Sequence, residues 1–172
     1  SLTTTIESGF GSGLFTSGFL LNNELTDFAR SYDAQMPMPA NVIEGGKRPR
    51  SSMSPTMVFD ESGELVLVTG SPGGNSIPAY VAKTILGIFG GQLTPQQAVD
   101  HPNIIARGQK VRVETGVSRG ALVSKGLSNQ GYEVENREGE NSGIHLILVT
   151  KDGLVGAADK RREGTVQAWK AQ

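Results

Sequence analysis

Cysteine is absent from this sequence of 172 residues, and histidine occurs only twice, at His101 and His145. Without cysteine, the chain has no disulfides, no thiolate nucleophile and no cysteine-ligated zinc. The two histidines lie far apart and lack the HExxH spacing, which argues against a histidine-based metal site. Neither histidine stands in a context that supports a Ser-His-Asp triad, so catalysis by such a triad is not expected.

The sequence also lacks a net charge of appreciable size and any long apolar run. Its 16 Lys and Arg residues are balanced by 17 Asp and Glu residues, which gives a formal net charge of −1. This balance offers no electrostatic reason to expect nucleic acid or an anionic membrane as a partner. No apolar run approaches the roughly 18 residues of a transmembrane helix. With 37% hydrophobic residues and the length of one ordinary domain, residues 1–172 are expected to form a single globular domain.

What the sequence does contain is a mixture of helical and strand-like apolar patterns. Alternating or continuous apolar runs predict strands at residues 1–8, 57–59, 65–68, 110–115, 132–138 and 143–150, and KDGLVGAAD (151–159) is expected to be a turn that leads into a short final strand. Helical spacing predicts helices over 77–89 and 118–130, and another that begins after the N-cap Thr94 and ends before Pro102. Residues 31–50, rich in Pro and Gly, are expected to form a long loop. This order predicts an α/β sandwich with a largely antiparallel sheet.

The stretch TGSPGGNSI, residues 69–77, is a glycine-rich turn between a predicted strand and a predicted helix. Unpaired amides and the helix dipole at such a junction favour a negative ligand, and glycines allow its close approach. The stretch has neither the Gly-Lys-Ser/Thr ending of a Walker loop nor a G-x-G-x-x-G pattern, which argues against a nucleotide site. Two interpretations stay open, a purely structural turn and an oxyanion hole built from adjacent amides.

Two further segments combine polar groups that suit an amino-acid ligand. KRPRSSMSPT (47–56) joins three cations to Ser51 and Ser52, a mixture that suits a carboxylate, although a solvated loop face has the same composition. NNELTD (22–27) places Glu24 and Asp27 three residues apart. Such a pair suits an ammonium group, a metal ion or acid–base chemistry, although acidic capping of a helix is the simpler alternative. An amino acid, which carries an anion and an ammonium group, would use both segments and the glycine turn.

In this order along the chain, the motifs LLNNELTDF, GKRPRSSMSPTMV and VTGSPGG resemble the small subunit of γ-glutamyltranspeptidases, also called γ-glutamyltransferases or glutathione hydrolases. SLTTTIESGFGSG and GLVGAADKR extend the resemblance over nearly the whole chain. The resemblance implies an N-terminal nucleophile hydrolase fold, an αββα sandwich of which this chain is the small-subunit part. It also implies a precursor that cuts itself to expose a catalytic threonine, whose own α-amino group is the base. Such enzymes need no metal and no organic cofactor.

Carried over position by position, the resemblance implies roles for individual residues. The residues implied to bind the γ-glutamyl group are Glu7, Glu24 and Asp27, which contact its α-amino group, and Ser51 and Ser52, which hold its α-carboxylate. The residues implied to act in catalysis are Gly73 and Gly74, whose amides form the oxyanion hole, and Thr5, which lies beside the nucleophile and supports it. On this basis the glycine turn is an oxyanion hole.

The sequence departs from the family pattern at the nucleophile. The catalytic threonine belongs upstream of SLTTTIES, and neither Ser1 nor Thr3 and Thr4 match its position. We therefore expect the chain to be most of a small subunit without its first strand, and inactive in γ-glutamyl transfer by itself. An unpaired sheet edge left by that strand is expected to promote self-association. A smaller departure is Asn75-Ser76, where many members carry Ser-Arg.

The resemblance also implies partners and a location. The partners are the large subunit of the same precursor, glutathione or another γ-glutamyl compound, and an amino-acid or peptide acceptor. A bacterial member would be periplasmic or extracellular. Two alternatives stay open: another reaction on the same scaffold, such as β-lactam side-chain cleavage or poly-γ-glutamate processing, and a non-catalytic homologue or partner subunit that binds without turnover. The presence of Glu24, Asp27, Ser51 and Ser52 favours γ-glutamyl recognition.

Overall fold

The computed structural model describes residues 1–169, whose contacts group them into two compact units. The first unit comprises Ser1–Thr3 and the chain from Met53 onward, and the second comprises Thr4–Ser52. Each unit combines short helices with strands. Among the described helices, none has the length and apolar character needed to cross a membrane.

A four-stranded antiparallel sheet forms the centre of the first unit. In spatial order its strands are β3 (Thr56–Phe59), β4 (Leu65–Gly70), β8 (His145–Thr150) and β9 (Gly153–Ala158). β3 and β4 form the hairpin that the sequence predicts, with Met57 opposite Val68. β8 and β9 form a second hairpin, in which Leu148 lies opposite Val155. Because side chains alternate between the two faces of a strand, one face of this sheet carries the residues that enter the core.

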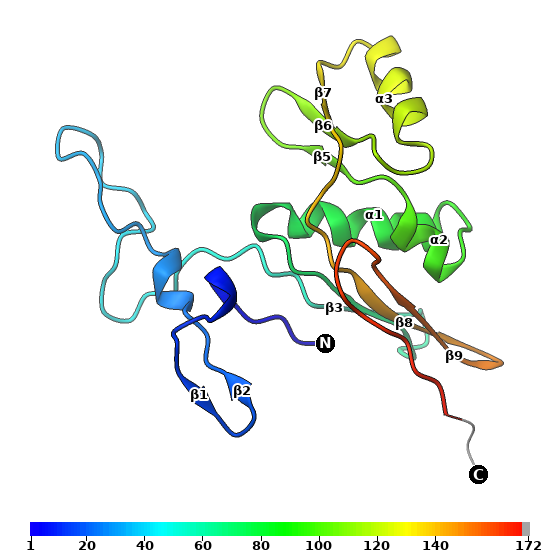
Figure 1. Ribbon diagram of the computed structural model, residues 1–172, viewed down its shortest axis with the longest axis horizontal. Helices are drawn as coiled ribbons and strands as arrows, with labels where there is room; N and C mark the ends of the chain where they lie inside the picture. The colour runs from blue at the N-terminus through cyan, green and yellow to red at the C-terminus, as the bar shows by residue number, and fades with distance from the viewer. Residues whose placement is uncertain (170–172) are drawn as a thin grey trace. The chain divides into compact units, whose positions relative to one another are not determined.

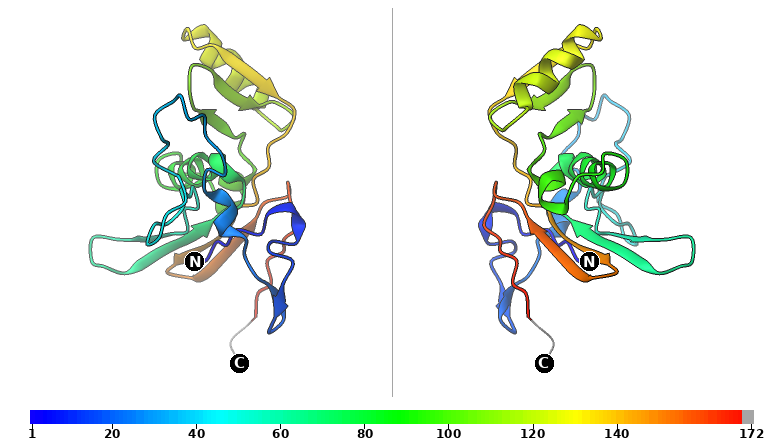
Figure 2. Two further views of the ribbon diagram at one scale, coloured as in Figure 1. Left: turned by 90° about the vertical axis from the view of Figure 1, so that its left-hand side faces the viewer. Right: turned by 90° about the vertical axis from the view of Figure 1, so that its right-hand side faces the viewer.

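Two helices cover that face of the sheet, as Figures 1 and 2 show. α1 (Ile77–Phe89) has the bounds that its apolar spacing predicts. α2 (Pro95–Asp100) begins with the predicted capping box, in which Thr94 Oγ1 accepts a hydrogen bond from the Gln97 amide and Gln97 Oε1 accepts one from the Thr94 amide. Most of the core lies between the helices and this sheet, and it extends past α1 to Ile105; burial of its apolar surface stabilises the fold. Its buried members are Leu67, Tyr80, Val99, Ile105, Ile144, Leu146 and Ala157.

A three-stranded sheet lies on the other side of α1 (Figure 1). Its strands, in spatial order, are β5 (Ile104–Ala106), β6 (Val111–Glu114) and β7 (Val134–Arg137). β5 and β6 are antiparallel, whereas β6 and β7 are parallel. The helix α3 (Gly120–Asn129) is the crossover that a parallel pair requires. The sequence pattern does not predict β5, because a strand of three residues is too short to show a period.

The second unit consists mostly of irregular backbone. Its regular elements are the hairpin of β1 (Phe15–Thr16) and β2 (Phe19–Leu20) and the 3₁₀ turns η1 (Glu7–Gly9) and η2 (Glu24–Asp27). The prediction of a strand at residues 1–8 is wrong, since this segment pairs with no strand among the described residues. The loop predicted over residues 31–50 is confirmed, and a β-bridge between Ala29 and Val42 ties it to the chain before it.

Candidate active site

The turn between β4 and α1 has a backbone that glycine adopts far more readily than other residues. It contains η3 (Gly74–Ser76), and Gly73 and Gly74 have φ values of +131° and +57°. A Cβ atom added at Gly73 would lie 2.5 Å from Tyr80 Cε2 and 3.2 Å from the carbonyl oxygen of Asn141. Gly73 is therefore required both by its conformation and by the close approach of Tyr80. At Gly74 an added Cβ would meet no atom within 4 Å, so that side of the turn is open.

The backbone amides of Gly73 and Gly74 are the groups of this turn that are available as hydrogen-bond donors to a ligand. Within residues 1–169, neither amide donates a hydrogen bond to a protein acceptor. Adjacent amides of this kind at the start of a helix stabilise a negatively charged oxygen atom. The turn therefore has the donors that an oxyanion hole requires.

Ser71 and Pro72 attach the turn to the segment before β8. The buried Ser71 Oγ accepts a hydrogen bond from the Gly143 amide at 3.1 Å and donates one to the Pro72 carbonyl oxygen at 2.7 Å. Pro72 packs closely on Gly143, where an added Cβ would lie 2.8 Å from Pro72 Cγ. These contacts hold the backbone immediately before Gly73 in place.

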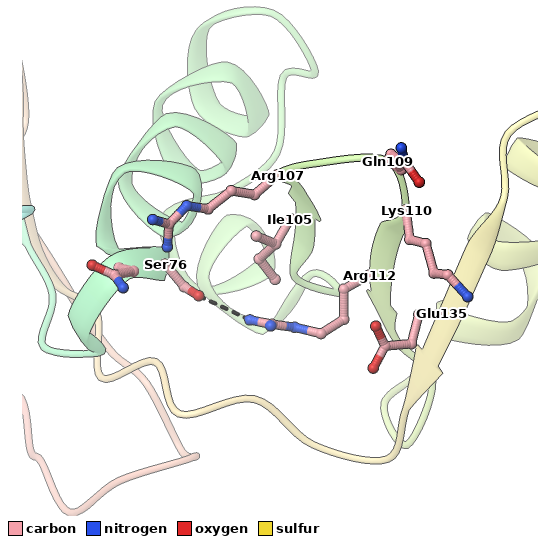
Figure 3. Close-up of a pocket in the computed structure, with 8 residues that line it drawn as sticks. Ser76, Ile105, Arg107, Gln109, Lys110, Arg112 and Glu135 are labelled. Atoms are coloured by element: carbon pink, nitrogen blue, oxygen red, sulfur yellow. Dashed lines mark hydrogen bonds between the residues drawn. The ribbon is translucent and has the colours of Figure 1, made fainter. Parts of the chain in front are cut away.

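A network of polar side chains lies behind the same turn. The Tyr80 hydroxyl donates to Glu140 Oε2 at 2.6 Å, and the Arg112 guanidinium pairs with the Glu140 carboxylate. Arg112 Nη2 also donates to Ser76 Oγ at 2.9 Å, at the end of η3 (Figure 3). Burial, together with the hydrogen bond to Glu140, raises the pKa of Tyr80 to about 12, so the hydroxyl stays protonated and remains a donor. Sequence analysis missed Tyr80, Arg112 and Glu140, because none of these three residues lies in a recognisable motif.

Replacing Tyr80 by phenylalanine is expected to lower the free energy of unfolding by about 1.5–3 kcal/mol, because the buried Glu140 carboxylate loses a donor. Arg112 still neutralises Glu140, so the variant should fold. The matched control is Tyr132→Phe, at a side chain that is 53% exposed. Urea unfolding followed by circular dichroism measures both variants. Equal stability of the two would show that the network does not support the turn.

The first residues of the chain lie against the strand that leads into the glycine turn. Ser1 Oγ donates a hydrogen bond to the Thr69 carbonyl oxygen at 2.9 Å. A Cβ added at Gly70 would lie 3.4 Å from Ser1 Oγ and 3.5 Å from Thr3 Oγ1. The chain before Thr4 is therefore placed beside the last residue of β4.

In the second unit, the predicted acidic residues gather around Asn23. Glu24 and Asp27 are the first and last residues of η2, and residues three apart share one face of a 3₁₀ turn. Asn23 Oδ1 accepts a hydrogen bond from the Glu7 amide at 3.0 Å, and the Asn23 amide donates to the Thr5 carbonyl oxygen at 3.1 Å. No ion pair of the described residues involves the carboxylates of this group. The structure thus brings together the segments that carry four of the predicted site residues.

Asn41 joins the serine segment to this group of carboxylates. Its side-chain nitrogen donates to the Asp27 carbonyl oxygen at 2.7 Å, and its Oδ1 accepts from the Arg50 amide at 2.8 Å. Ser51 and Ser52 follow Arg50 directly and end the second unit. Sequence analysis missed Asn41, since a single asparagine in a long loop belongs to no pattern.

The predicted site residues are thus divided between the two units. Gly73 and Gly74 lie in the first unit, and the remaining six lie in the second. Among residues 1–169, no group of three or more His, Asp and Glu side chains is placed to hold a metal ion. The groups that the described residues offer are carboxylates, hydroxyls and backbone amides, which suit hydrogen-bonded recognition and acyl chemistry.

Comparison with known proteins gives consistent matches. The family model described as Gamma-glutamyltranspeptidase matches residues 1–169. The glutathione hydrolase proenzyme of Bacillus subtilis (strain 168) is 37% identical over 169 residues, which cover 95% of this chain and 27% of that protein. The glutathione hydrolase proenzyme of Escherichia coli (strain K12) is 35% identical over 175 residues, which cover 94% of this chain and 29% of that protein. The chain therefore spans less than a third of the length of these curated relatives.

Solved structures share the fold. The γ-glutamyltranspeptidase of Pseudomonas nitroreducens matches with a TM-score of 0.76 at 30% identity, covering 98% of this chain and 92% of that chain. A mutant of the Helicobacter pylori γ-glutamyltranspeptidase matches with a TM-score of 0.72 at 32% identity, covering 94% of this chain and 92% of that chain. These matches confirm the predicted fold class, a mixed α/β architecture with largely antiparallel sheets of the N-terminal nucleophile hydrolase type.

Proposed function

Because this chain belongs to the γ-glutamyltranspeptidase family, we propose that it supplies the γ-glutamyl-binding residues and the oxyanion hole of an enzyme that cleaves or transfers γ-glutamyl groups. The observation that carries the proposal is the glycine turn, in which the amides of Gly73 and Gly74 have no protein acceptor within residues 1–169. The curated relatives are named glutathione hydrolases, so glutathione is the first substrate to test.

The amino-acid end of the substrate is recognised through its charges. The carboxylates of Glu7, Glu24 and Asp27 bind the α-ammonium group, for which they are available because they form no ion pair with a described residue. The hydroxyls of Ser51 and Ser52 donate to the α-carboxylate. Hydrogen bonds to charged groups contribute about 1.5–3 kcal/mol each, so several of them select a γ-glutamyl group over a simple acyl group.

The reaction is acyl transfer through a γ-glutamyl ester. The hydroxyl oxygen of a threonine from the rest of the protein, with Thr5 beside it, bonds to the γ-carbonyl carbon. The carbon–nitrogen bond then breaks, and the hydroxyl proton passes through the threonine α-amino group to the leaving amine. The amides of Gly73 and Gly74 stabilise the oxyanion of the tetrahedral intermediate. Water or an acceptor amine then bonds to the ester carbon, the carbon–oxygen bond to threonine breaks, and a proton from the water or amine passes to the threonine oxygen.

The partner that we assign to the chain is the large subunit of the same precursor. The sheet face turned away from α1 and α2 carries Met57, Ile147 and Leu154, whose exposed fractions are 48%, 46% and 70%. A sheet with an apolar face is normally covered by a second layer. The curated relatives are proenzymes much longer than this chain, so the remainder of the precursor is the candidate for that layer.

Asp27 provides the test of donor recognition in the full-length precursor. Asp27→Asn is expected to lower kcat/KM for a γ-glutamyl anilide by about tenfold to a hundredfold, chiefly through KM, because a charged hydrogen bond to the substrate is lost. The much slower cleavage of glutaryl anilide, which has no α-amino group, should change little. Asp152→Asn, at an exposed residue of the β8–β9 turn, is the matched control. A similar loss on both donors would contradict the role of Asp27.

The same assays separate the competing functions. Faster cleavage of glutaryl anilide than of γ-glutamyl anilide would indicate an acylase on this scaffold. A precursor that neither cleaves itself nor releases glutamate would favour a non-catalytic binding protein. Self-cleavage before a threonine, followed by release of glutamate from glutathione, is the result that we expect.

A further inference from the structure

Asn41 joins three segments of the second unit through hydrogen bonds. Its side-chain Nδ2 donates to the Asp27 carbonyl oxygen at 2.7 Å, and its Oδ1 accepts from the Arg50 amide at 2.8 Å. Its own carbonyl oxygen accepts a third hydrogen bond, from the Ala29 amide at 2.9 Å. One residue of the long loop therefore connects the end of η2 with the residue immediately before Ser51.

The two side-chain hydrogen bonds of Asn41 require a carboxamide. The Asp27 carbonyl oxygen can only accept a hydrogen bond, whereas the Arg50 amide can only donate one. A carboxamide carries a donor and an acceptor on a single carbon atom, so it satisfies both partners at once. Alanine loses both bonds, and glutamine places the same two groups one carbon atom farther from the backbone. The length of this side chain therefore sets the separation between η2 and residues 50–52.

The second unit has few other contacts that could fix this separation. Among residues 4–52, Phe28 is the one buried residue, and it is 7% exposed. Residues 31–50 form a long loop, whose pairing with the chain before it consists of the bridge between Ala29 and Val42. Burial of apolar surface normally holds segments together. Because this unit buries so little of it, the hydrogen bonds of Asn41 are expected to decide how its segments are placed.

A γ-glutamyl group carries its ammonium and carboxylate groups on one carbon atom, so their binding groups must also be held close together. Two contacts that are held at the correct spacing bind cooperatively, because the first contact brings the second group to its partner. We propose that Asn41 is a positioning residue that fixes the spacing of Asp27 from Ser51 and Ser52, and thereby selects substrates with both charges on one carbon atom. This inference rests on the proposed γ-glutamyl-binding role of these three residues.

Asn41 is expected to affect substrate selection and not the chemical step. It lies in the second unit, whereas the amides of Gly73 and Gly74 belong to the first. Loss of its side-chain hydrogen bonds therefore leaves the proposed oxyanion donors in place. Without Asn41, the groups that bind the ammonium and the carboxylate move independently, so each still binds its own part of the substrate. The advantage of a substrate that carries both groups is then lost.

Cleavage of three anilides by the full-length precursor tests this role. γ-Glutamyl anilide carries both charged groups, glutaryl anilide lacks the ammonium group, and 4-aminobutyryl anilide lacks the carboxylate. Asn41→Ala is expected to lower kcat/KM for γ-glutamyl anilide about tenfold, chiefly through KM, because the two hydrogen bonds that fix the spacing are lost. Cleavage of the two substrates with a single charged group should change by less than about twofold, since neither depends on the spacing.

A second variant and a control show whether spacing is the cause. Asn41→Gln keeps both hydrogen-bonding groups, so it should fold, but its longer side chain should also weaken the preference for γ-glutamyl anilide. Asn129→Ala, at the exposed last residue of α3, is the matched control. An equal loss on all three anilides would show a merely structural role, and wild-type kinetics in both Asn41 variants would show none. Either result would overturn the proposal.

Binding without turnover separates this inference from the proposed function. Saturation-transfer NMR titration of the precursor measures its affinities for L-glutamate and for 4-aminobutyrate, which lacks the α-carboxylate. In Asn41→Ala the affinity for L-glutamate should fall about tenfold, while that for 4-aminobutyrate changes little. This result in a precursor that releases no glutamate from γ-glutamyl anilide would refute the proposed function and support the role of Asn41. Turnover by the wild type, with unchanged affinity for L-glutamate in both Asn41 variants, would refute that role alone.

Discussion

Replacing Gly73 by alanine is expected to lower kcat for γ-glutamyl release by about a hundredfold to a thousandfold, the loss that follows removal of one oxyanion donor. The new Cβ would lie 2.5 Å from Tyr80 Cε2, and alanine rarely adopts the φ of +131° found there. Tyr80 is buried and hydrogen-bonded to Glu140, so its ring cannot turn aside. The backbone must shift instead, and this shift moves the amides of Gly73 and Gly74 away from the reacting oxygen.

Alanine substitutions at two other glycines distinguish this loss of kcat from the general loss of stability caused by alanine at positive φ. Gly63, in the β3–β4 turn, has a φ of +87° and no atom within 4 Å of an added Cβ. Gly63→Ala should therefore lower the free energy of unfolding by about 1–2 kcal/mol and leave kcat unchanged. Gly74 has a φ of +57° and open space around an added Cβ, so Gly74→Ala keeps its amide. The kcat of this variant should lie between those of Gly63→Ala and Gly73→Ala. Steady-state kinetics on the full-length precursor make the comparison, and wild-type kcat in Gly73→Ala would refute the oxyanion hole.

Replacing Arg161 by methionine is expected to lower the free energy of unfolding by about 3–5 kcal/mol, because two buried carboxylates lose their counter-ion. Arg161 pairs with Glu114 through Nε at 2.7 Å and with Asp159 through Nη1 at 3.0 Å. It also donates to the carbonyl oxygens of Val99 and His101. Glu114 and Asp159 are each only 1% exposed, so water cannot replace the lost partner. The residue thus joins the chain after β9 to α2 and to β6.

The neighbouring Arg162 provides the matched control for Arg161. Arg162 is exposed, and its guanidinium donates to the carbonyl oxygen of Asn141. Arg162→Met is therefore expected to change the free energy of unfolding by no more than about 1 kcal/mol. Urea unfolding of the whole chain compares the two variants. A small effect at Arg161 would mean that the buried cluster does not hold the structure together.

The pH dependence of stability provides a second test of the cluster formed by Arg161, Glu114 and Asp159. Burial disfavours ionisation of Glu114, but hydrogen bonds from Arg161 and the Asn103 amide outweigh it and hold the pKa of Glu114 below its usual value. Burial also opposes ionisation of Asp159, and hydrogen bonds from Ser142 and Arg161 likewise hold the pKa of Asp159 low. Such groups stabilise the fold above their unfolded pKa of about 4, and this stabilisation is lost as pH falls through the folded pKa. In Arg161→Met this loss of stability should begin at higher pH. Burial raises the pKa of both carboxyl groups, and the hydrogen bonds from Arg161 that lower it are then missing.

The local elements of the fold follow from residues that are close in sequence. The bounds of α1 follow from its apolar spacing, and the start of α2 follows from Thr94 and Gln97, which bond to each other across one turn. The β3–β4 hairpin follows from two apolar arms around Glu61 to Gly63. Each of these signals lies within a few residues, so neighbouring side chains are enough to determine the result. The strand expected at residues 1–8 fails for the opposite reason, because a strand needs a partner that its own sequence does not specify.

By itself the sequence determined the helices, the main hairpin, the family motifs and the abundance of glycine at the turn. Only the tertiary structure decided that β6 and β7 pair in parallel, that Asn41 joins Asp27 to the serine segment, and that Tyr80 meets Glu140 behind Gly73. Tyr80 and Glu140 are 60 residues apart in the chain. Contacts at such separations form only when whole elements pack together, since the energy of each pair is small and its position depends on the core as a whole. The motifs therefore indicate the groups that we propose bind and react, whereas packing decides how firmly the backbone that carries them is held.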